Sequence, residues 1–382
     1  DDVVGPGFPV AVLKEEADFS ASYEDWNLDR LLDWKAYLQR YAHGSLGRPA
    51  SVEEEGSVSS KTTPAVSVCG PLQCLEHIAS MSTHQQFRDH TPLSQRCICG
   101  PVLQMAIPFR VLIRNGIPDE LRREVWLTCS GANAAMLAKP GYFAKLARDF
   151  AHQRHEFAAM RDIRKDVLRT LPMHPFYQDA DCQGIKRLER VLSCFALHNP
   201  MIGYTQSQNF LSAVFLLYMT EEEAFWMLCT VCEHLSANMY RKSMVGSLAQ
   251  LSVLERLLVQ VCPAVASRID EHGFRVSMAA TGWFMCLFVT FLPLEICLRV
   301  LDNYFYSTHF VFRVALSIFI LNEQRLLESQ SIEDVLFALG RRDYVAAEVL
   351  SVAHHLCDKV TDAEIERMMA EEMSRSIHQV AR

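Results

Sequence analysis

Apolar residues recur at three- and four-residue spacing along much of this chain, and this pattern constrains the fold more than any other feature. Such spacing puts apolar side chains on one face of a helix, whereas a half-buried strand alternates apolar and polar residues. Little alternation occurs here, and successive helices are predicted over residues 210–219, 223–235, 248–261 and 278–289, divided by Gly246, Pro263 and Gly273. The fold class is therefore all-α.

Length, charge and cysteine content limit the class of protein. The chain has 382 residues, half of them apolar, which is enough for a large core. Its net charge is −8, and Lys and Arg are interspersed with acidic residues, so no nucleic-acid partner is expected. The thirteen cysteines are scattered through apolar runs, as in a protein with reduced thiols in the cytoplasm. The chain begins at Asp1 without an initiator Met, and we expect a fragment of a larger protein.

A polar stretch, residues 163–209, interrupts this apolar pattern, and it opens with IRKDVLRTLP at residues 163–172. Asp166 and Arg169 are three residues apart, so in one helical turn both side chains leave the same face. Pro172 disfavours helical backbone at the residue before it, which predicts that the turn ends near Arg169–Leu171. A long cation at such an end can reach outward, with Asp166 orienting it.

The same stretch closes with IGYTQSQN at residues 202–209. Gly203 and Tyr204 predict a turn, and Gln206 carries a neutral amide next to an apolar helix. A planar guanidinium and an amide together suit phosphoryl transfer to water: the cation contacts the negative charge that spreads over the phosphoryl oxygens. The amide can hold the attacking water through one acceptor and one donor. Arg169 alone would more simply be a solvated cation at a helix end.

Four segments in a fixed order carry a resemblance to a known family. They are RNGIPDELRREVWLTCSGA (114–132), IRKDVLRT (163–170), GYTQSQN (203–209) and WFMCLFVTFLPLEICLRVLD (283–302). Together they resemble the TBC domain of Rab GTPase-activating proteins. That family supplies an arginine finger from an I-x-x-D-x-x-R motif and a glutamine finger from a Y-x-Q motif.

The resemblance implies a role for each matching residue. Arg169 and Gln206 are the expected catalytic fingers, and the expected orienting or supporting residues are Asp166, Tyr204 and Asn209. Ile163, Arg122 and Trp126 are expected to be framework. The implied fold is a two-lobed, multi-helix TBC-domain array with the fingers exposed in a groove.

The sequence also departs from the family pattern beside the second finger. Where the family usually has Y-C-Q-G-M-N, this chain has Ser207 and Gln208 in place of Gly and Met. If the glycine serves a left-handed backbone, serine costs about 1–2 kcal/mol of strain. Two readings of function therefore stand: a Rab GTPase activator, or a catalytically impaired TBC module that binds a GTPase or scaffold without accelerating hydrolysis.

We divide the chain into four regions. Residues 1–66 hold one amphipathic helix, at 23–41, and a flexible linker; residues 67–107 are a cysteine-containing lead-in; residues 108–342 form the TBC domain; and residues 343–382 are C-terminal helices packed on the domain or following it. Met368, Met369 and Met373 give the last helix an apolar face, and a docked terminal helix is the simpler reading.

No cofactor or metal site of its own is expected in this chain. Cys69, Cys74, Cys97 and Cys99 lie close together, but their spacing does not match paired zinc ligands. Cys229 and Cys232 form a CxxC inside a predicted helix, which indicates buried packing. No phosphate-binding glycine loop occurs, so the chain itself is not expected to bind GTP. The resemblance implies that GTP and Mg²⁺ belong to the partner, a Rab-family small GTPase in its GTP form. Through that partner the protein is expected to be cytoplasmic and peripheral to endomembranes, in vesicle traffic; its oligomeric state stays open.

Overall fold

The computed structural model describes residues 30–37, 107–153, 159–236, 239–240 and 245–380. No strand occurs in these ranges, and the predicted all-α class is confirmed. The described residues fall into two compact parts, Pro9–Lys139 and Pro140–Arg382. The lead-in cysteines, the linker and both ends of the helix predicted at 23–41 lie outside the described residues.

The first part contains a helix at residues 30–37 followed by α4 (Ile107–Asn115), α5 (Asp119–Ser130) and α6 (Ala132–Ala138). Trp34 packs edge-on against Phe109, with ring centroids 5.5 Å apart, and its indole Nε1 donates to the Gly116 carbonyl at 3.0 Å. The apolar face predicted for this helix is therefore buried on α4 and the turn after it.

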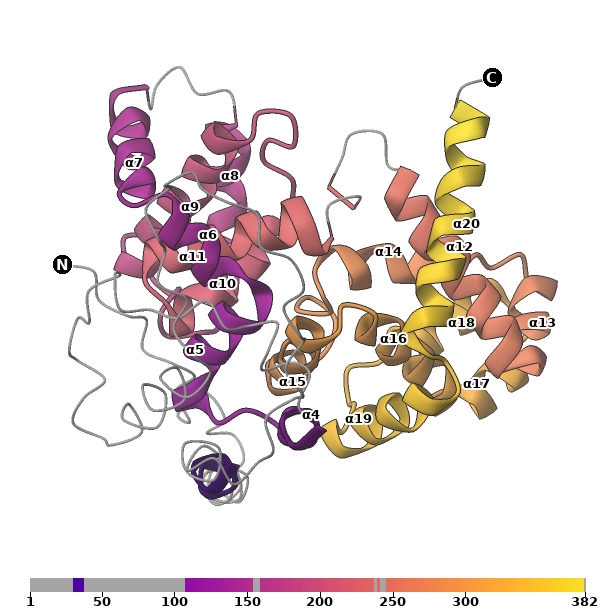
Figure 1. Cartoon of the computed structure of the whole chain (residues 1–382). Helices are drawn as coiled ribbons and strands as arrows, with labels where there is room; N and C mark the ends of the chain where they lie inside the picture. The colour runs from indigo at the N-terminus through magenta and orange to yellow at the C-terminus, as the bar shows by residue number, and fades with distance from the viewer. Residues whose placement is uncertain (1–29, 38–106, 154–158, 237–238, 241–244, 381–382) are drawn as a thin grey trace, which may run out of the picture. The chain divides into compact units, whose positions relative to one another are not determined.

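The second part contains two groups of helices (Figure 1). The first group packs around α9 and consists of α7 (Tyr142–Gln153), α8 (Met160–Val167), α9 (Gln183–His198), α10 (Gln208–Tyr218), α11 (Glu221–Thr230) and the π-helix η3 (Val231–Leu235). Thr220 and Glu223 form the capping box that starts α11.

The second group packs around α12 and α16. It consists of α12 (Val245–Val261), α13 (Pro263–Glu271), α14 (Ser277–Met285), α15 (Leu294–Tyr306), α16 (Phe310–Leu321), α17 (Glu323–Glu328), α18 (Ile332–Leu339), α19 (Ala346–His355), the 3-10 turn η4 (Leu356–Asp358) and α20 (Asp362–Val380). Hydrogen bonds join the two groups next to η3: the Ser236 and Tyr304 hydroxyls lie 2.8 Å apart, and the Tyr240 hydroxyl donates to the Met285 carbonyl at 2.8 Å.

Two boundary predictions were wrong. Gly246 does not precede α12 but lies in its first turn, where backbone N–H groups have no intrahelical partner and glycine breaks nothing. The helix predicted to run to residue 289 ends at Met285, because Leu287 and Phe288 adopt positive φ values of 45° and 67°. Both side chains are buried there, and the Phe288 ring stacks on Trp283, so packing outweighs the helical preference of the apolar run.

The C-terminal helix docks as predicted. α20 packs along α12 with Ile365 and Met368 buried. Arg256 on α12 forms ion pairs of 3.0 Å with both Glu371 and Glu372. Exposed pairs of this kind contribute little individually, so the buried apolar face carries most of the docking energy.

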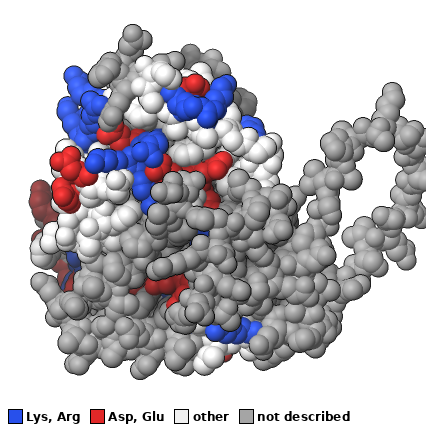
Figure 2. Space-filling model, turned by 90° about the vertical axis from the view of Figure 1, so that its left-hand side faces the viewer, with Lys and Arg blue, Asp and Glu red and all other residues white. Residues whose placement is uncertain are grey.

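Where Figure 2 draws described residues, mainly in its upper part, lysines and arginines lie among aspartates and glutamates. Pairs of opposite charge also occur on α8, where Arg161 lies 3.9 Å from Asp162, and Arg164 lies 3.8 Å from Glu189 on α9. The described surface therefore carries the mixed charge that the sequence predicts.

Candidate functional site

Asp166, at the C-terminal end of α8, and Arg169, in the turn that follows, form one residue pair of the polar stretch. Ile163 and Val167 are buried and fix the inner face of the helix. The chain leaves the helix after Val167, slightly before the predicted end, through a tight turn in which the Arg169 N–H donates to the Asp166 carbonyl at 3.2 Å. The turn directs Arg169 outward: its side chain is 55% exposed, against 9% for Asp166.

The Asp166 carboxylate contacts two groups, one with each oxygen. Oδ1 lies 2.7 Å from the Arg169 guanidinium, as the three-residue spacing predicts. Oδ2 accepts a hydrogen bond of 2.6 Å from the Tyr204 hydroxyl. Burial, together with the hydrogen bond to Asp166, raises the pKa of Tyr204, so this hydroxyl stays a donor over the whole working pH range. One carboxylate therefore links the turn that carries Arg169 to the loop that carries Gln206.

A second set of hydrogen bonds joins the same two segments beneath the surface. The Asn209 amide donates to the Thr170 hydroxyl at 2.7 Å, and that hydroxyl donates to the Asp166 carbonyl at 2.6 Å. The Asn209 amide oxygen in turn accepts from the Ser207 N–H at 3.1 Å. Thr170 and Asn209 are both fully buried, so these hydrogen bonds are shielded from water.

Residues 199–207, which connect α9 to α10 and are here named the glutamine loop, present Gln206 to solvent. The Gln206 side chain is exposed and makes no hydrogen bond with any other residue that the structure describes. Arg169 and Gln206 are thus two outward polar groups on segments that Asp166–Tyr204 and Thr170–Asn209 hold together. Such a pair can contact one external ligand without first breaking a contact between the two.

The two departures from the family motif act in opposite directions. Ser207 has a φ of 132°, in the region that favours glycine, and its hydroxyl is buried. Gln208 is fully buried; its Oε1 accepts from the Thr205 N–H and its Nε2 donates to the Gly203 carbonyl, both at 3.2 Å. Serine therefore adds strain, while glutamine adds two hydrogen bonds that methionine could not make.

Comparison with known proteins agrees with this arrangement of helices and motifs. The family model for the Rab-GTPase-TBC domain matches residues 119–327, more than half of the chain. The chain belongs to the Rab-GTPase-TBC domain family. The match contains α8, the glutamine loop and the start of α10, and so includes every residue of the hydrogen-bonded site.

Relatives of this TBC domain include GTPase-activating protein gyp2 of Schizosaccharomyces pombe, which is 33% identical over 222 residues, or 58% of this chain and 30% of the relative. Small G protein signaling modulator 3 of Rattus norvegicus is 30% identical over 262 residues, or 67% of this chain and 35% of the relative. The chain thus spans between 20% and 35% of the length of the curated relatives it matches.

Solved structures show the same fold. The Chlamydomonas flagellar RabGAP TBC domain aligns with a TM-score of 0.58 and 27% identity, covering 65% of this chain and 84% of that one. The Ypt/Rab-GAP domain of Gyp1p aligns with a TM-score of 0.51 and 20% identity, over 68% of this chain and 91% of that one.

Two of the three residues expected to be framework, Arg122 and Trp126, lie on α5 in the first part of the chain. Arg122 and Trp126 are fully buried, and Arg122 forms an ion pair with Asp119 one turn earlier. Pro118 is the N-cap of this helix. Neither the Arg122 nor the Trp126 side chain is exposed to solvent, and a framework role for both residues stays a prediction.

The structure describes one of the two cysteine patterns found in the sequence. Cys229 and Cys232 are buried free thiols, and burial raises the pKa of Cys232. The zinc pattern at Cys69–Cys99 lies outside the described residues.

Within the described ranges no single helix is both long and apolar enough to cross a bilayer. Helices α12 and α13 are long and apolar enough only as a pair, and the chain bends by 120° between them.

Proposed function

We propose that this TBC domain accelerates GTP hydrolysis by a Rab-type small GTPase, with Arg169 as arginine finger and Gln206 as glutamine finger. The observation that carries the proposal is the Asp166 carboxylate, which bonds the Arg169 guanidinium at 2.7 Å and the Tyr204 hydroxyl at 2.6 Å. That bond pattern orients the cation and couples it to the loop of the second finger. A guanidinium held in this way loses little conformational entropy when it closes on a transition state, and the Tyr204 bond holds the backbone that carries Gln206 beside it.

The chemistry follows from what each group can donate. The guanidinium carries a permanent charge and several N–H donors, which suit the negative oxygens of the transferring phosphoryl group. The Gln206 amide offers one acceptor and two donors, enough to hold a water in line for attack. The nucleotide and Mg²⁺ arrive with the GTPase, so the domain supplies positioning and electrostatic stabilisation. Membrane association would come through the partner, and intracellular membrane traffic is the process to which we assign the domain.

Phosphate release from a panel of GTP-loaded Rab GTPases tests the proposal. The parent protein should accelerate at least one GTPase by about 10³-fold or more, and Arg169→Ala should remove most of that acceleration. Gln206→Ala should also lower the rate while binding to the GTP-bound partner persists. Arg161→Ala is the matched control, since Arg161 is an exposed arginine on α8, the helix that precedes the turn carrying Arg169. Equal loss in Arg161→Ala and Arg169→Ala would contradict the assignment of the finger.

The strained backbone at Ser207 favours a second candidate, a TBC module that binds a GTPase or scaffold without activating it. Ser207 precedes α10 directly and lies next to Gln206, so relief of its strain could move the amide. Tight binding of the parent to one GTP-bound Rab, with no acceleration of any member of the panel, would establish this candidate over the first.

A further inference from the structure

The side-chain amide of Asn199 holds the start of the glutamine loop, because it bonds both the loop and Glu233 on η3. The Asn199 backbone carbonyl accepts from the Gly203 N–H at 2.8 Å, and its side-chain oxygen accepts from the Ile202 N–H at 3.1 Å. Gly203 has a φ of 66°, which lets the chain turn sharply there. The Asn199 amide nitrogen donates to Glu233 Oε1 at 2.6 Å. The first half of the loop thus depends on the orientation of one amide, and Glu233 sets that orientation.

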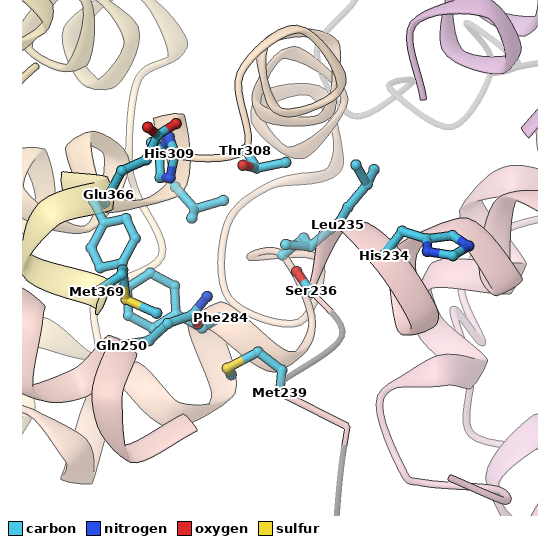
Figure 3. Close-up of a pocket in the computed structure, with 13 residues that line it drawn as sticks. His234, Leu235, Ser236, Met239, Gln250, Phe284, Thr308, His309, Glu366 and Met369 are labelled. Atoms are coloured by element: carbon cyan, nitrogen blue, oxygen red, sulfur yellow. The ribbon is translucent and has the colours of Figure 1, made fainter. Parts of the chain in front are cut away.

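Glu233 is itself fixed by its place on the π-helix η3. His198 Nε2 lies 3.3 Å from Glu233 Oε1, and His198 Nδ1 lies 3.0 Å from the Tyr142 hydroxyl. Burial would raise the pKa of Glu233, but the hydrogen bonds from His198 and Asn199 outweigh it and hold this pKa below its ordinary value. The next residues, His234, Leu235 and Ser236, line a pocket of about 230 Å³ instead (Figure 3).

The end of the loop is held by Gln208 in the first turn of α10. Its amide bonds the Thr205 N–H and the Gly203 carbonyl, and these two backbone groups flank Tyr204. The side chain is fully buried, so water does not compete for its two hydrogen bonds. Between these two fixed ends, Gln206 has an exposed side chain on a backbone that is clamped on both sides.

We propose that Gln208 and Glu233 are positioning residues that hold the glutamine loop with Gln206 turned outward. Neither residue touches a bound partner in this proposal: Gln208 acts through the backbone of residues 203–205, and Glu233 acts through Asn199. The inference rests on the proposed function for its effect on rate, and on the hydrogen bonds alone for its effect on the loop. A loop anchored in this way keeps its amide close to the productive geometry, which catalysis needs to within about 0.5 Å.

Steady-state GTP hydrolysis on the activated Rab provides the first test. Gln208→Met keeps the length of the side chain and removes both hydrogen bonds, and it should lower kcat about ten-fold with KM changed by less than about two-fold. Glu233→Gln keeps the shape and removes the charge, and it should lower kcat about three-fold. Gln324→Met and Glu333→Gln, at exposed positions on α17 and α18, are the matched controls and should leave both constants unchanged.

A double-mutant cycle separates positioning from general loss of structure. If Gln208 acts through Gln206, then Gln208→Met should cost nothing further in a Gln206→Ala background. An equal loss in both backgrounds, or an unchanged kcat in Gln208→Met, overturns the proposal.

Amide hydrogen exchange over residues 199–207 tests the same proposal without any GTPase. Gln208→Met and Glu233→Gln should each speed exchange of this segment, while exchange in α12 and α16 stays as in the parent. Unchanged exchange in the loop overturns the proposal whatever the activity. If the parent accelerates no Rab, the proposed function fails, and this exchange experiment alone decides whether the two residues hold the loop.

Discussion

Removal of the Tyr204 hydroxyl is the sharpest test of the coupling between the two finger segments. Tyr204→Phe keeps the ring and deletes the donor that lies 2.6 Å from Asp166 Oδ2. A hydrogen bond to a charged group contributes about 1.5–3 kcal/mol, so the free energy of unfolding should fall by about 2 kcal/mol. For a domain of this size that corresponds to a lower Tm by about 4–8 °C.

The same substitution should also lower the catalytic rate. Without the Tyr204 hydroxyl, the Asp166 carboxylate can rotate away from its present position, because only the exposed Arg169 guanidinium still bonds it. We expect kcat for GTP hydrolysis to fall about ten-fold while binding of the GTP-bound partner is unchanged. Thermal unfolding followed by circular dichroism and phosphate release measured on the same preparations give the two numbers.

Tyr344→Phe supplies the control for loss of a buried tyrosine hydroxyl. Its hydroxyl accepts from the Asn322 amide at 2.9 Å, far along the chain from either finger. That variant should lose about 1 kcal/mol of stability and keep the parent rate. If Tyr204→Phe matches the parent in both Tm and kcat, the Asp166–Tyr204 bond does not couple the two segments and the reasoning fails.

Three further predictions concern stability. Burial lowers the pKa of His174 to about 4, and its Nδ1 accepts from the Phe176 N–H, so the folded state prefers neutral imidazole. The free energy of unfolding should therefore fall as pH drops from about 6.5 toward 4, and it should fall less in His174→Asn. Urea titrations at several pH values measure both. Ser207→Gly should raise the free energy of unfolding by about 1 kcal/mol by relieving the φ of 132°, and a lower Tm would count against strain there. Arg313→Leu should cost about 1.5–3 kcal/mol because it removes the buried guanidinium that donates to the Val360 carbonyl and to the half-exposed Asp362. Arg256→Ala, at a partly exposed position of α12, should cost under about 1 kcal/mol, and chemical denaturation measures both.

The sequence predicted those parts of the site that follow from local spacing. Asp166 and Arg169 share a face because a helical turn requires it, and Gly203 marks a turn because few other residues tolerate its φ of 66°. Tyr204 was expected to support the site by resemblance alone, and its partner, the second oxygen of Asp166, could not be read from the chain. That contact joins residues 38 positions apart in the sequence, and residue spacing does not predict contacts of this kind.

Thr170, Gln208 and Glu233 were missed as parts of the site for the same reason. Thr170 reads as an ordinary residue between a helix end and a proline, and Gln208 read as a departure that could spoil the loop. Only the fold shows that Gln208 is buried with both amide atoms bonded to the loop backbone. Glu233 belongs to a stretch that periodicity placed in one continuous helix, whereas the structure changes to π geometry after Thr230. The signal available in the sequence was a glutamine just before the apolar run that forms α10.

The π geometry of η3 also affects how far the length of this segment can vary. A π turn holds one more residue than an α turn, so it absorbs an extra position without displacing the helix before it. Deleting one residue from Val231–Leu235 would therefore convert this turn to α geometry and leave α11 and the segment after η3 in their places. The same deletion inside α11 would rotate everything after it by about 100°, and the Ser236 hydroxyl would then leave Tyr304. Related chains should therefore gain or lose a residue in η3 more readily than in α11.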